Sequence, residues 1–287
     1  MKHFPLAVVL GCSLYALGFW LFGTMGKLPW DEASSIVRQG YKPHDAITTR
    51  PWWAAKARQW LGDLSFLQVR DLEHEDLSHF TRLWVISLPG HYHLGGPFID
   101  GTYTMVNQVD LDGLLVELWK LPEPVEVLYD FRENLNQARV FVAARTGDKP
   151  CSRWVRDRWI CTGRDWNYVG RVIVEMGDDP REVIWAHPSD LGTLVISYAQ
   201  VPTGKTLLVH TGLTPPGART PNGSPVHLDL ELDGKLLGTI MQPNQTGYFP
   251  HSFDISNAGP GQHRVVFKVH ADNIGMRHFC FQAEVVR

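Results

Sequence analysis

Short runs of alternating apolar and polar residues fill the last third of the chain, residues 205–287, and turn residues separate them. Residues 226–232 (VHLDLEL) alternate without a break, and an Asp-Gly pair follows at 233–234. A period of two predicts a strand with one face in a core, and Asp-Gly is a frequent hairpin turn. Similar runs lie at residues 251–256, 263–271 and 278–286. Short strands at this spacing predict an antiparallel β-sandwich or jelly roll.

The alternation extends upstream to Cys151, so the pattern predicts a jelly-roll β-sandwich over residues 151–287. Residues 66–150 also read as β-rich, with strands predicted near 82–88, 125–131 and 138–145. This region is either a separate domain or an extension of the same sandwich. The predicted fold class is mainly β, with one or two short helices.

Residues 31–65 are predicted to form a linker and an amphipathic helix. Residues 31–39 are either linker or a short helix. Pro51 at a first helical position, followed by apolar residues at helical spacing, predicts a helix that ends near Leu61. The tryptophans of this helix lie either on a membrane surface or against the folded domain.

Residues 4–26 contain no Asp, Glu, Lys or Arg. About 20 apolar residues suffice to cross a bilayer as a helix, so residues 1–30 are predicted to be an N-terminal transmembrane signal anchor. A cleaved signal peptide and a lipoprotein site at Cys12 remain alternatives. The anchor predicts a single-pass membrane protein whose bulk is extracytoplasmic, and periplasmic if the source is bacterial.

The amino-acid composition limits the kinds of molecule that this protein is expected to bind. Hydrophobic residues make up 44% and charged residues 20% of the chain, which favours a folded domain over disorder. A net charge of −3 without a Lys/Arg run gives no basic surface for nucleic acid. Eleven tryptophans supply many aromatic side chains, which either fill cores or contact sugar rings and lipid.

Cys151 and Cys161 bracket the segment SRWVRDRWI. In a β-hairpin this spacing brings the two thiols together, so a disulfide is a candidate and implies an oxidising compartment. Two unpaired buried thiols are the alternative. Cys280 alternates with apolar neighbours and is predicted to lie in the core.

No motif establishes an enzyme. His74, Glu75 and His79 fail the zincin pattern because the two histidines are five residues apart rather than four. The pair His91 and His93 and the pair Asp110 and Asp112 read as loop and turn residues. The sequence lacks G-x-S-x-G, a P-loop and a dinucleotide fingerprint, although remote carboxylate pairs stay open. We therefore expect no metal, and the sequence favours a binding protein over an enzyme.

Six residues near predicted turns or strand ends are candidate ligand contacts. Trp166 and Tyr168 lie in a loop flanked by Gly and Asp, where aromatic rings are available for stacking on a sugar. Aromatic rings supply apolar contact, while arginine and histidine supply hydrogen bonds to hydroxyls. Core packing is the alternative for Trp185, and a structural role is the alternative for Arg277 and His278. The candidates are Trp166, Tyr168, Trp185, His187, Arg277 and His278.

The order of elements at the C-terminus resembles the galactose-binding-like jelly rolls, which include many carbohydrate-binding modules. The likeness is carried by residues 228–237, 253–256, 261–270 and 278–286 and concerns the fold alone, because no diagnostic motif is present. The resemblance implies ligand loops at one end of a sandwich and sometimes a structural Ca²⁺. Such modules bind sugars or serve only as scaffolds.

The combined features predict a membrane-anchored, extracytoplasmic β-sandwich protein that binds carbohydrate or envelope glycan as an accessory module. The expected partners are the membrane, through the N-terminal helix, and a glycan. One alternative is a structural subunit of a membrane protein complex that uses the sandwich as a protein interface. A second alternative is a glycan-active hydrolase or transferase.

Overall fold

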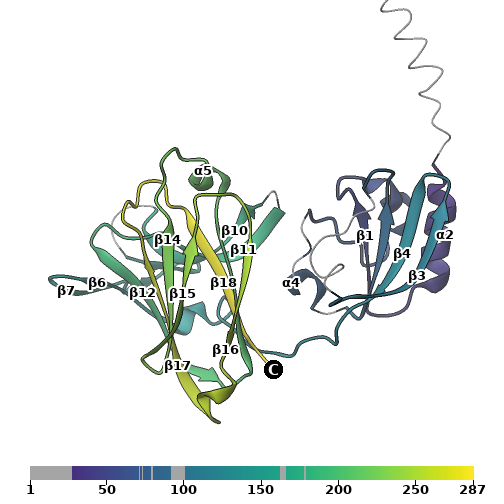
Figure 1. Cartoon of the computed structure of the whole chain (residues 1–287). Coiled ribbons are helices and arrows are strands. Elements are labelled where there is room, and N and C mark those ends of the chain that lie inside the picture. Colours follow the sequence, from purple (N-terminus) through teal and green to yellow (C-terminus); the bar gives the residue numbers. More distant parts are fainter. Residues whose placement is uncertain are drawn as a thin grey trace, which may run out of the picture. The chain divides into compact units, whose positions relative to one another are not determined.

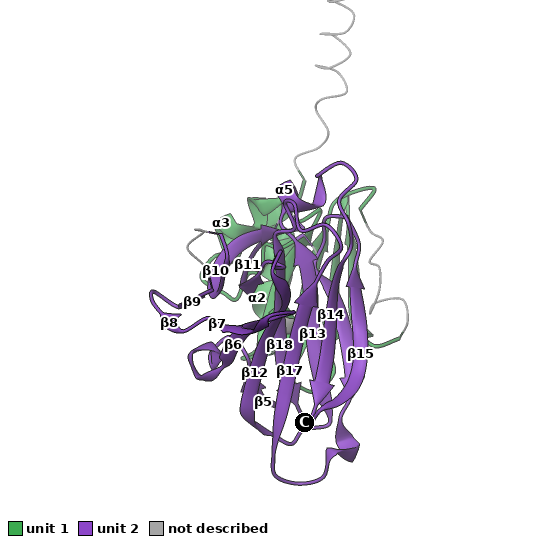
Figure 2. Cartoon of the chain, turned by 90° about the vertical axis from the view of Figure 1, so that its left-hand side faces the viewer, with its two compact units in different colours: residues 1–69, 76–124 green, residues 70–75, 125–287 purple. Residues whose placement is uncertain are grey.

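A computed structural model describes residues 28–70, 72, 74–78, 80–91, 101–161, 166–177 and 179–287. The chain divides into two compact units (Figures 1 and 2). Unit 1 comprises residues 1–69 and 76–124, and unit 2 comprises residues 70–75 and 125–287. All but the last three residues of the predicted anchor lie outside the described residues. Within the described part, no helix is long and apolar enough to span a bilayer.

Unit 1 has one four-stranded sheet with helices on one face. In sheet order its strands are β1 (Asp45–Arg50), β2 (Arg82–Ser87), β4 (Leu114–Lys120) and β3 (Thr104–Leu111). Its helices are α2 (Trp30–Gly40), η1 (Ala55–Ala57) and α3 (Arg58–Leu61), and α4 (His74–Leu77) bridges the two units in sequence. Ala33 and Val37 of α2 pack with Ile47, Trp84 and Ile86 in an apolar core.

Two details of unit 1 differ from the sequence prediction. The strand β1 lies within residues 31–65, which the sequence predicts as a linker and an amphipathic helix, and it pairs in parallel with β2 because the connection between them contains helical turns that carry the chain back across the sheet. The predicted helix at 51–61 begins only at Ala55, since the four residues before it form a turn. Its apolar positions Ala57 and Leu61 are buried, whereas Trp53 is exposed.

A buried carboxylate organises the polar part of unit 1. Asp45 is fully buried at the start of β1. Its two oxygens accept hydrogen bonds from Arg82 Nε at 2.7 Å and from Trp84 Nε1 at 3.0 Å. A carboxylate can be buried when charge and hydrogen bonds replace its water, and here these bonds tie β1 to β2.

Unit 2 is a two-sheet sandwich. One sheet, called sheet B here, runs β16 (Phe249–Asp254), β13 (Thr206–Leu213), β18 (Phe279–Val286), β11 (Asp179–Ala186), β10 (Tyr168–Met176), β9 (Arg158–Ile160) and β8 (Arg153–Trp154), with β5 (Val127–Asp130) beside β18. The other, sheet C, runs β15 (Lys235–Gln242), β14 (Val226–Leu232), β17 (Gln262–His270), β12 (Gly192–Pro202), β6 (Arg139–Ala144) and β7 (Gly147–Pro150). The short helices are η3 (Leu135–Gln137), α5 (Pro215–Ala218) and η4 (Ser256–Ala258).

The predicted mainly-β sandwich is confirmed. From β11 to β18 the chain passes back and forth between the two sheets, as in a jelly roll. Phe267 of sheet C meets Phe281 of sheet B with ring centroids 5.0 Å apart, and both side chains are fully buried. The alternating apolar positions of β14, β17 and β18 thus form the core between the sheets.

The sandwich begins earlier than the predicted boundary at Cys151. β6 pairs with β12 along six residues, and β5 pairs with β18. Phe131, just after β5, is fully buried and packs edge-on against Tyr198 at 4.8 Å. These contacts join residues 125–150 to unit 2, while the preceding strands belong to unit 1.

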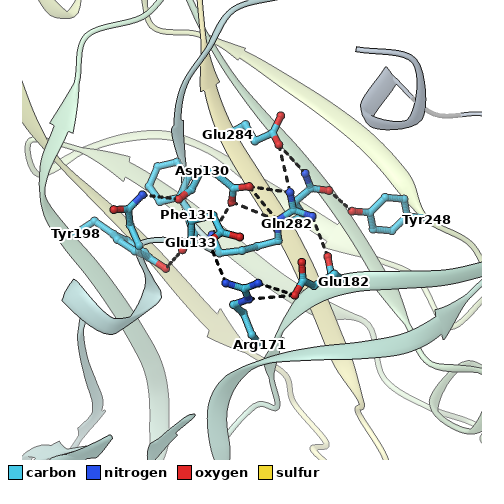
Figure 3. Close-up of polar contacts among 11 residues, drawn as sticks. Asp130, Phe131, Glu133, Arg171, Glu182, Tyr198, Tyr248, Gln282 and Glu284 are labelled. Atoms are coloured by element: carbon cyan, nitrogen blue, oxygen red, sulfur yellow. Dashed lines mark hydrogen bonds and ion pairs between the residues drawn. The ribbon is translucent and has the colours of Figure 1, made fainter. Parts of the chain in front are cut away.

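Sheet B forks near Asp130, Glu182 and Glu284, which come from three different strands (Figure 3). β11 pairs with β18 only at Ile184 and Trp185, and β5 takes over the same edge of β18 from Glu284 onward. Arg132 donates to the Asp130 carboxylate at 2.7 Å and to the carbonyl oxygen of Glu182 at 3.0 Å. Arg132 thus joins the end of β5 to β11 at the point where these two strands separate. Beyond this point the β10–β11 hairpin leaves β18, and Met176 of the hairpin packs with Tyr248 and Cys280.

The cysteines lie where the hairpin pattern suggested. Cys151 and Cys161 form a disulfide across the β8–β9 hairpin, with their Cα atoms 4.0 Å apart. Cys280 is a buried free thiol on β18, and its burial raises the pKa well above that of an exposed thiol.

His263 forms hydrogen bonds with Asp233, Thr203 and Gly259 at one end of sheet C, and this set of contacts is called the histidine latch here. Nδ1 of His263 lies 2.6 Å from Oδ2 of Asp233, and Nε2 lies 3.0 Å from Oγ1 of Thr203 and 3.2 Å from the carbonyl oxygen of Gly259. Acceptors at both ring nitrogens favour the doubly protonated ring. The hydrogen bond that His263 donates to Asp233 accordingly raises the pKa of His263, and bonds from Arg264 N–H and His263 lower the pKa of Asp233.

We predict that this latch weakens as the pH rises. A raised histidine pKa contributes stability that is fully present below the unfolded-state pKa of about 6.5 and is lost as the pH passes the folded-state value. The wild-type chain should therefore exceed His263→Gln in free energy of unfolding at pH 6, with a difference that shrinks by pH 9. Urea unfolding at both pH values measures it, and Asp233→Asn should behave like His263→Gln. A difference that is the same at both pH values contradicts the latch.

Candidate ligand-binding site at the loop end

Several loops of unit 2 meet at one end of the sandwich, the end marked by α5 at the top of Figure 1. Antiparallel strands of both sheets begin or end here, so the connections collect together. Loops at the end of a rigid sandwich are the usual place for ligand contacts. The loops are residues 145–146, 187–191, 214–225, 243–248 and 271–278.

A groove of about 910 Å³ lies among three of these loops, on the side of sheet C. Its lining is mainly polar, with Asp190 and Asp272 as acceptors and Arg145 and Lys149 as donors. Leu191, which is 40% exposed, adds an apolar surface. The groove has the size of a small-molecule site and convergent polar groups. The lining comprises residues 143–146, 149, 189–193 and 270–274.

Arg277 holds the loops behind this groove. Its side chain is fully buried, and its guanidinium donates to Gly217 O at 2.8 Å, Ser224 O at 3.2 Å and Asn244 Oδ1 at 2.6 Å. A fourth bond joins its Nε to Gly275 O at 3.2 Å. One cation therefore ties together three loops, those at 214–225, 243–248 and 271–278.

Every one of these acceptors is neutral, so the positive charge of Arg277 is solvated by carbonyl dipoles. Burial lowers the pKa of Arg277, but a guanidinium stays charged in proteins. Gly223 permits the arrangement, since a Cβ there would lie 2.3 Å from the guanidinium nitrogens. A hydrogen bond to a charged group contributes about 1.5–3 kcal/mol, and an acceptor left alone in the interior costs a similar amount.

The groove-lining loop is fixed further by its neighbour. Ser224 Oγ donates to Asn273 O at 3.1 Å and accepts from Asn273 N at 3.1 Å. Oδ1 of Asn273 accepts from Gly275 N at 3.0 Å, which shapes the turn. The backbone of Asp272 and Ile274, on either side, is therefore held in place by residues outside the groove.

The structure brings five of the six predicted contact residues into one aromatic cluster at the same end. Ring centroids are 4.5 Å apart for Trp166 and His187, 5.8 Å for Tyr168 and Trp185, and 5.2 Å for Trp185 and His278. Nε1 of Trp185 donates to the carbonyl oxygen of Trp166 at 3.0 Å. The cluster lies at the starts of β10 and β18 and the end of β11, on sheet B.

Most of this cluster is used for packing. Trp185 and His187 are buried, and Trp166, Tyr168 and His278 are half-buried. Tyr168 stacks on Trp185 and also has the Arg158 guanidinium over its ring at 4.4 Å. Since the rings face one another, their surfaces are largely occupied.

Both histidines of the cluster are held neutral. Burial lowers the pKa of His187 to about 4, partly opposed by the hydrogen bond between its Nδ1 and Pro188 O at 2.7 Å. Burial and the charge of Arg277 lower the pKa of His278. A neutral ring packs in this apolar setting without a desolvation cost for charge.

None of the six predicted residues lines the groove. His187 and His278 instead lie at the strand-side ends of two of the three loops that line it, and Arg277 binds to residues of three loops. The missed lining residues have a weak signal in the sequence. Ser189-Asp190 and Asp272-Asn273 are turn dipeptides directly beside strand ends, and only the fold shows that these turns meet.

The structure gives no support for a structural Ca²⁺ site. Within the described ranges, no group of three or more His, Cys, Asp or Glu side chains is placed to hold a metal ion. The side chains of His74, Glu75, His79 and His93 lie outside the description.

Neither a protein-family model nor a curated protein sequence matches this chain. Several of the solved structures similar to it contain carbohydrate-binding modules. The CBM51-2 and INT domains of Clostridium perfringens ZmpB share 11% identity over 66% of this chain, with a TM-score of 0.32. The match spans 41% of the length of that protein chain.

Two further similar structures hold sugars. The CBM51 of a Clostridium perfringens GH95, in complex with methyl-galactose, shares 16% identity over 41% of this chain and 81% of its own, with a TM-score of 0.29. The CBM27-1 of Caldicellulosiruptor saccharolyticus, in complex with mannohexaose, shares 12% identity over 56% of this chain and 94% of its own, with a TM-score of 0.32. Likenesses this distant indicate no ligand for this chain, and the fold rests on the sheets described above.

Replacing Arg277 by lysine should loosen the loop end and leave the sheets intact. An ammonium cannot reach four acceptors in separate loops, so we expect a loss of at least about 2 kcal/mol in free energy of unfolding. Amide hydrogen exchange should quicken more in residues 214–225 and 271–278 than in β14 or β17, because these loops open locally while the core strands open only on global unfolding. The exposed Arg264→Lys is the matched control. Unchanged exchange in these loops would show that Arg277 does not hold them.

Proposed function

We propose that unit 2 is a carbohydrate-binding module and that the groove at its loop end receives the sugar. The carrying observation is the groove itself, which gathers charged and amide side chains from three segments, one of which, the loop 271–278, the buried Arg277 joins to loops 214–225 and 243–248. Sugar hydroxyls are both donors and acceptors, so a lining that mixes Arg145 and Lys149 with Asp190 and Asp272 can satisfy them. The apolar Leu191 offers a surface for the C–H face of a ring.

The arrangement favours a binding module over an enzyme. The lining carboxylates Asp190 and Asp272 belong to loops at the rim of an open groove. Preorganised loops lower the entropy cost of binding, because fewer side chains and peptide groups must be ordered by the ligand. Binding without turnover is the activity that these features support.

We expect the groove variants Lys149→Ala and Asp272→Ala each to weaken sugar binding about tenfold, the effect of one lost hydrogen bond of about 1.4 kcal/mol. A panel of neutral and acidic oligosaccharides on an array identifies the ligand, and calorimetry with that sugar measures the affinities. Lys235→Ala, in an exposed hairpin turn away from the groove, is the matched control.

Two outcomes contradict this proposal. If no oligosaccharide binds, the module is not a carbohydrate binder. If a sugar binds and the groove variants bind it as well as the wild type, while Trp166→Ala or Tyr168→Ala abolishes binding, then the aromatic cluster is the site.

We further propose that the chain presents this module outside the cytoplasm on an N-terminal membrane anchor, as an accessory domain for envelope glycans. The uncharged residues 4–26 support the anchor, and the Cys151–Cys161 disulfide supports an oxidising compartment. Intact cells should therefore expose unit 2 to a membrane-impermeant lysine reagent once any outer barrier is opened. Labelling only after lysis of the inner membrane contradicts this location.

A further inference from the structure

Two histidines face each other on the outer surface of sheet C. His227 of β14 and His270 of β17 are direct partners in the antiparallel register. Their neighbours Leu228 and Val269 are fully buried in the core, so the two histidines lie on the opposite, outward face. The ring centroids are 5.2 Å apart, and the rings are within 10° of parallel.

A carboxylate orients one of these rings. Nε2 of His270 lies 3.3 Å from Oδ2 of Asp229, and Oδ1 of the same carboxylate accepts a 2.6 Å hydrogen bond from Thr239 Oγ1. A carboxylate is an acceptor, so this 3.3 Å ion-pair contact favours the tautomer of His270 with the proton on Nε2, although the two groups are not aligned as a hydrogen bond. Nδ1 of His270 is then a lone-pair nitrogen, and within the described chain it makes no hydrogen bond. His227 likewise has no hydrogen bond there.

Thr239 contacts Asp229, and Asp229 contacts His270, which is the arrangement that commonly supports metal-binding histidines. A ligating imidazole commonly donates its second N–H to a carboxylate, which fixes the ring and raises its basicity. Directly opposite residues of two antiparallel strands have Cβ atoms about 4.5–5.5 Å apart. One ion can therefore contact a nitrogen of both rings after a rotation of the side chains. His270 has the room to rotate, because its side chain is 42% exposed.

We propose that His227 and His270 together bind one divalent transition-metal ion, Zn²⁺, Ni²⁺ or Cu²⁺, with water at the remaining positions. Imidazole suits these metals, and the two-histidine set leaves an open coordination sphere. His270 also belongs to the lining of the loop-end groove, so the ion lies at the sheet end of that groove. The proposal stands independently of sugar binding.

The test is a calorimetric titration of the untagged full chain with ZnCl₂ and with NiCl₂ at pH 7.5. We expect one site per chain, and His227→Ala and His270→Ala should each lower its affinity at least tenfold. Asp229→Asn should lower it about tenfold through the orientation of His270, in the range known for such supporting carboxylates. His91→Ala removes an exposed histidine of unit 1 and is the control.

The outcomes separate cleanly. Loss of affinity in both histidine variants, with far-ultraviolet circular dichroism unchanged, supports the shared site. Absence of binding to the wild type, or an effect of only one histidine or of neither, overturns it. Lys149→Ala should keep the metal affinity, so a failure of sugar binding and a failure of metal binding are distinguishable.

Discussion

The loop end of the sandwich depends on a single buried cation. Arg277 reaches backbone or amide oxygens in three loops that are separate in sequence, and it does so without a carboxylate among its partners. A buried charge is tolerated only when polar groups replace its water. The loops must therefore close around the guanidinium in one arrangement, and this arrangement fixes the loop 271–278, which forms one wall of the groove.

The rest of unit 2 places that cation. The alternating apolar residues of β14, β17 and β18 build the core, which sets where the strands end and which loops meet. Arg132 bonds Asp130 and Glu182 at the fork in sheet B, where β11 leaves β18 and β5 joins it. Burial between the sheets thus provides most of the stability, while the two arginines determine where particular segments turn.

Periodicity made the fold predictable, and the site was predictable only in part. Residues 226–232 (VHLDLEL) and the neighbouring strands alternate regularly between apolar and polar residues. One buried and one exposed face could therefore be predicted for each strand, and these faces define the sandwich. The parallel pairing of β1 with β2 was not predictable, because a short strand reads the same in either direction. Trp166, Tyr168, Trp185, His187 and His278 do come together, but as packing. The groove residues Asp190 and Asp272 lie 82 residues apart in sequence, and turn chemistry at each says nothing about their proximity.

Mapping the contact surface of a bound sugar tests the central claim most directly. Amide hydrogen exchange of the full chain, with and without the oligosaccharide that binds, locates the residues that the ligand protects. The account predicts slower exchange in residues 143–146, 189–193 and 270–274, with the core strands unchanged. Protection confined to residues 166–168, or to the opposite end of the sandwich near Asp233 and His263, would contradict it.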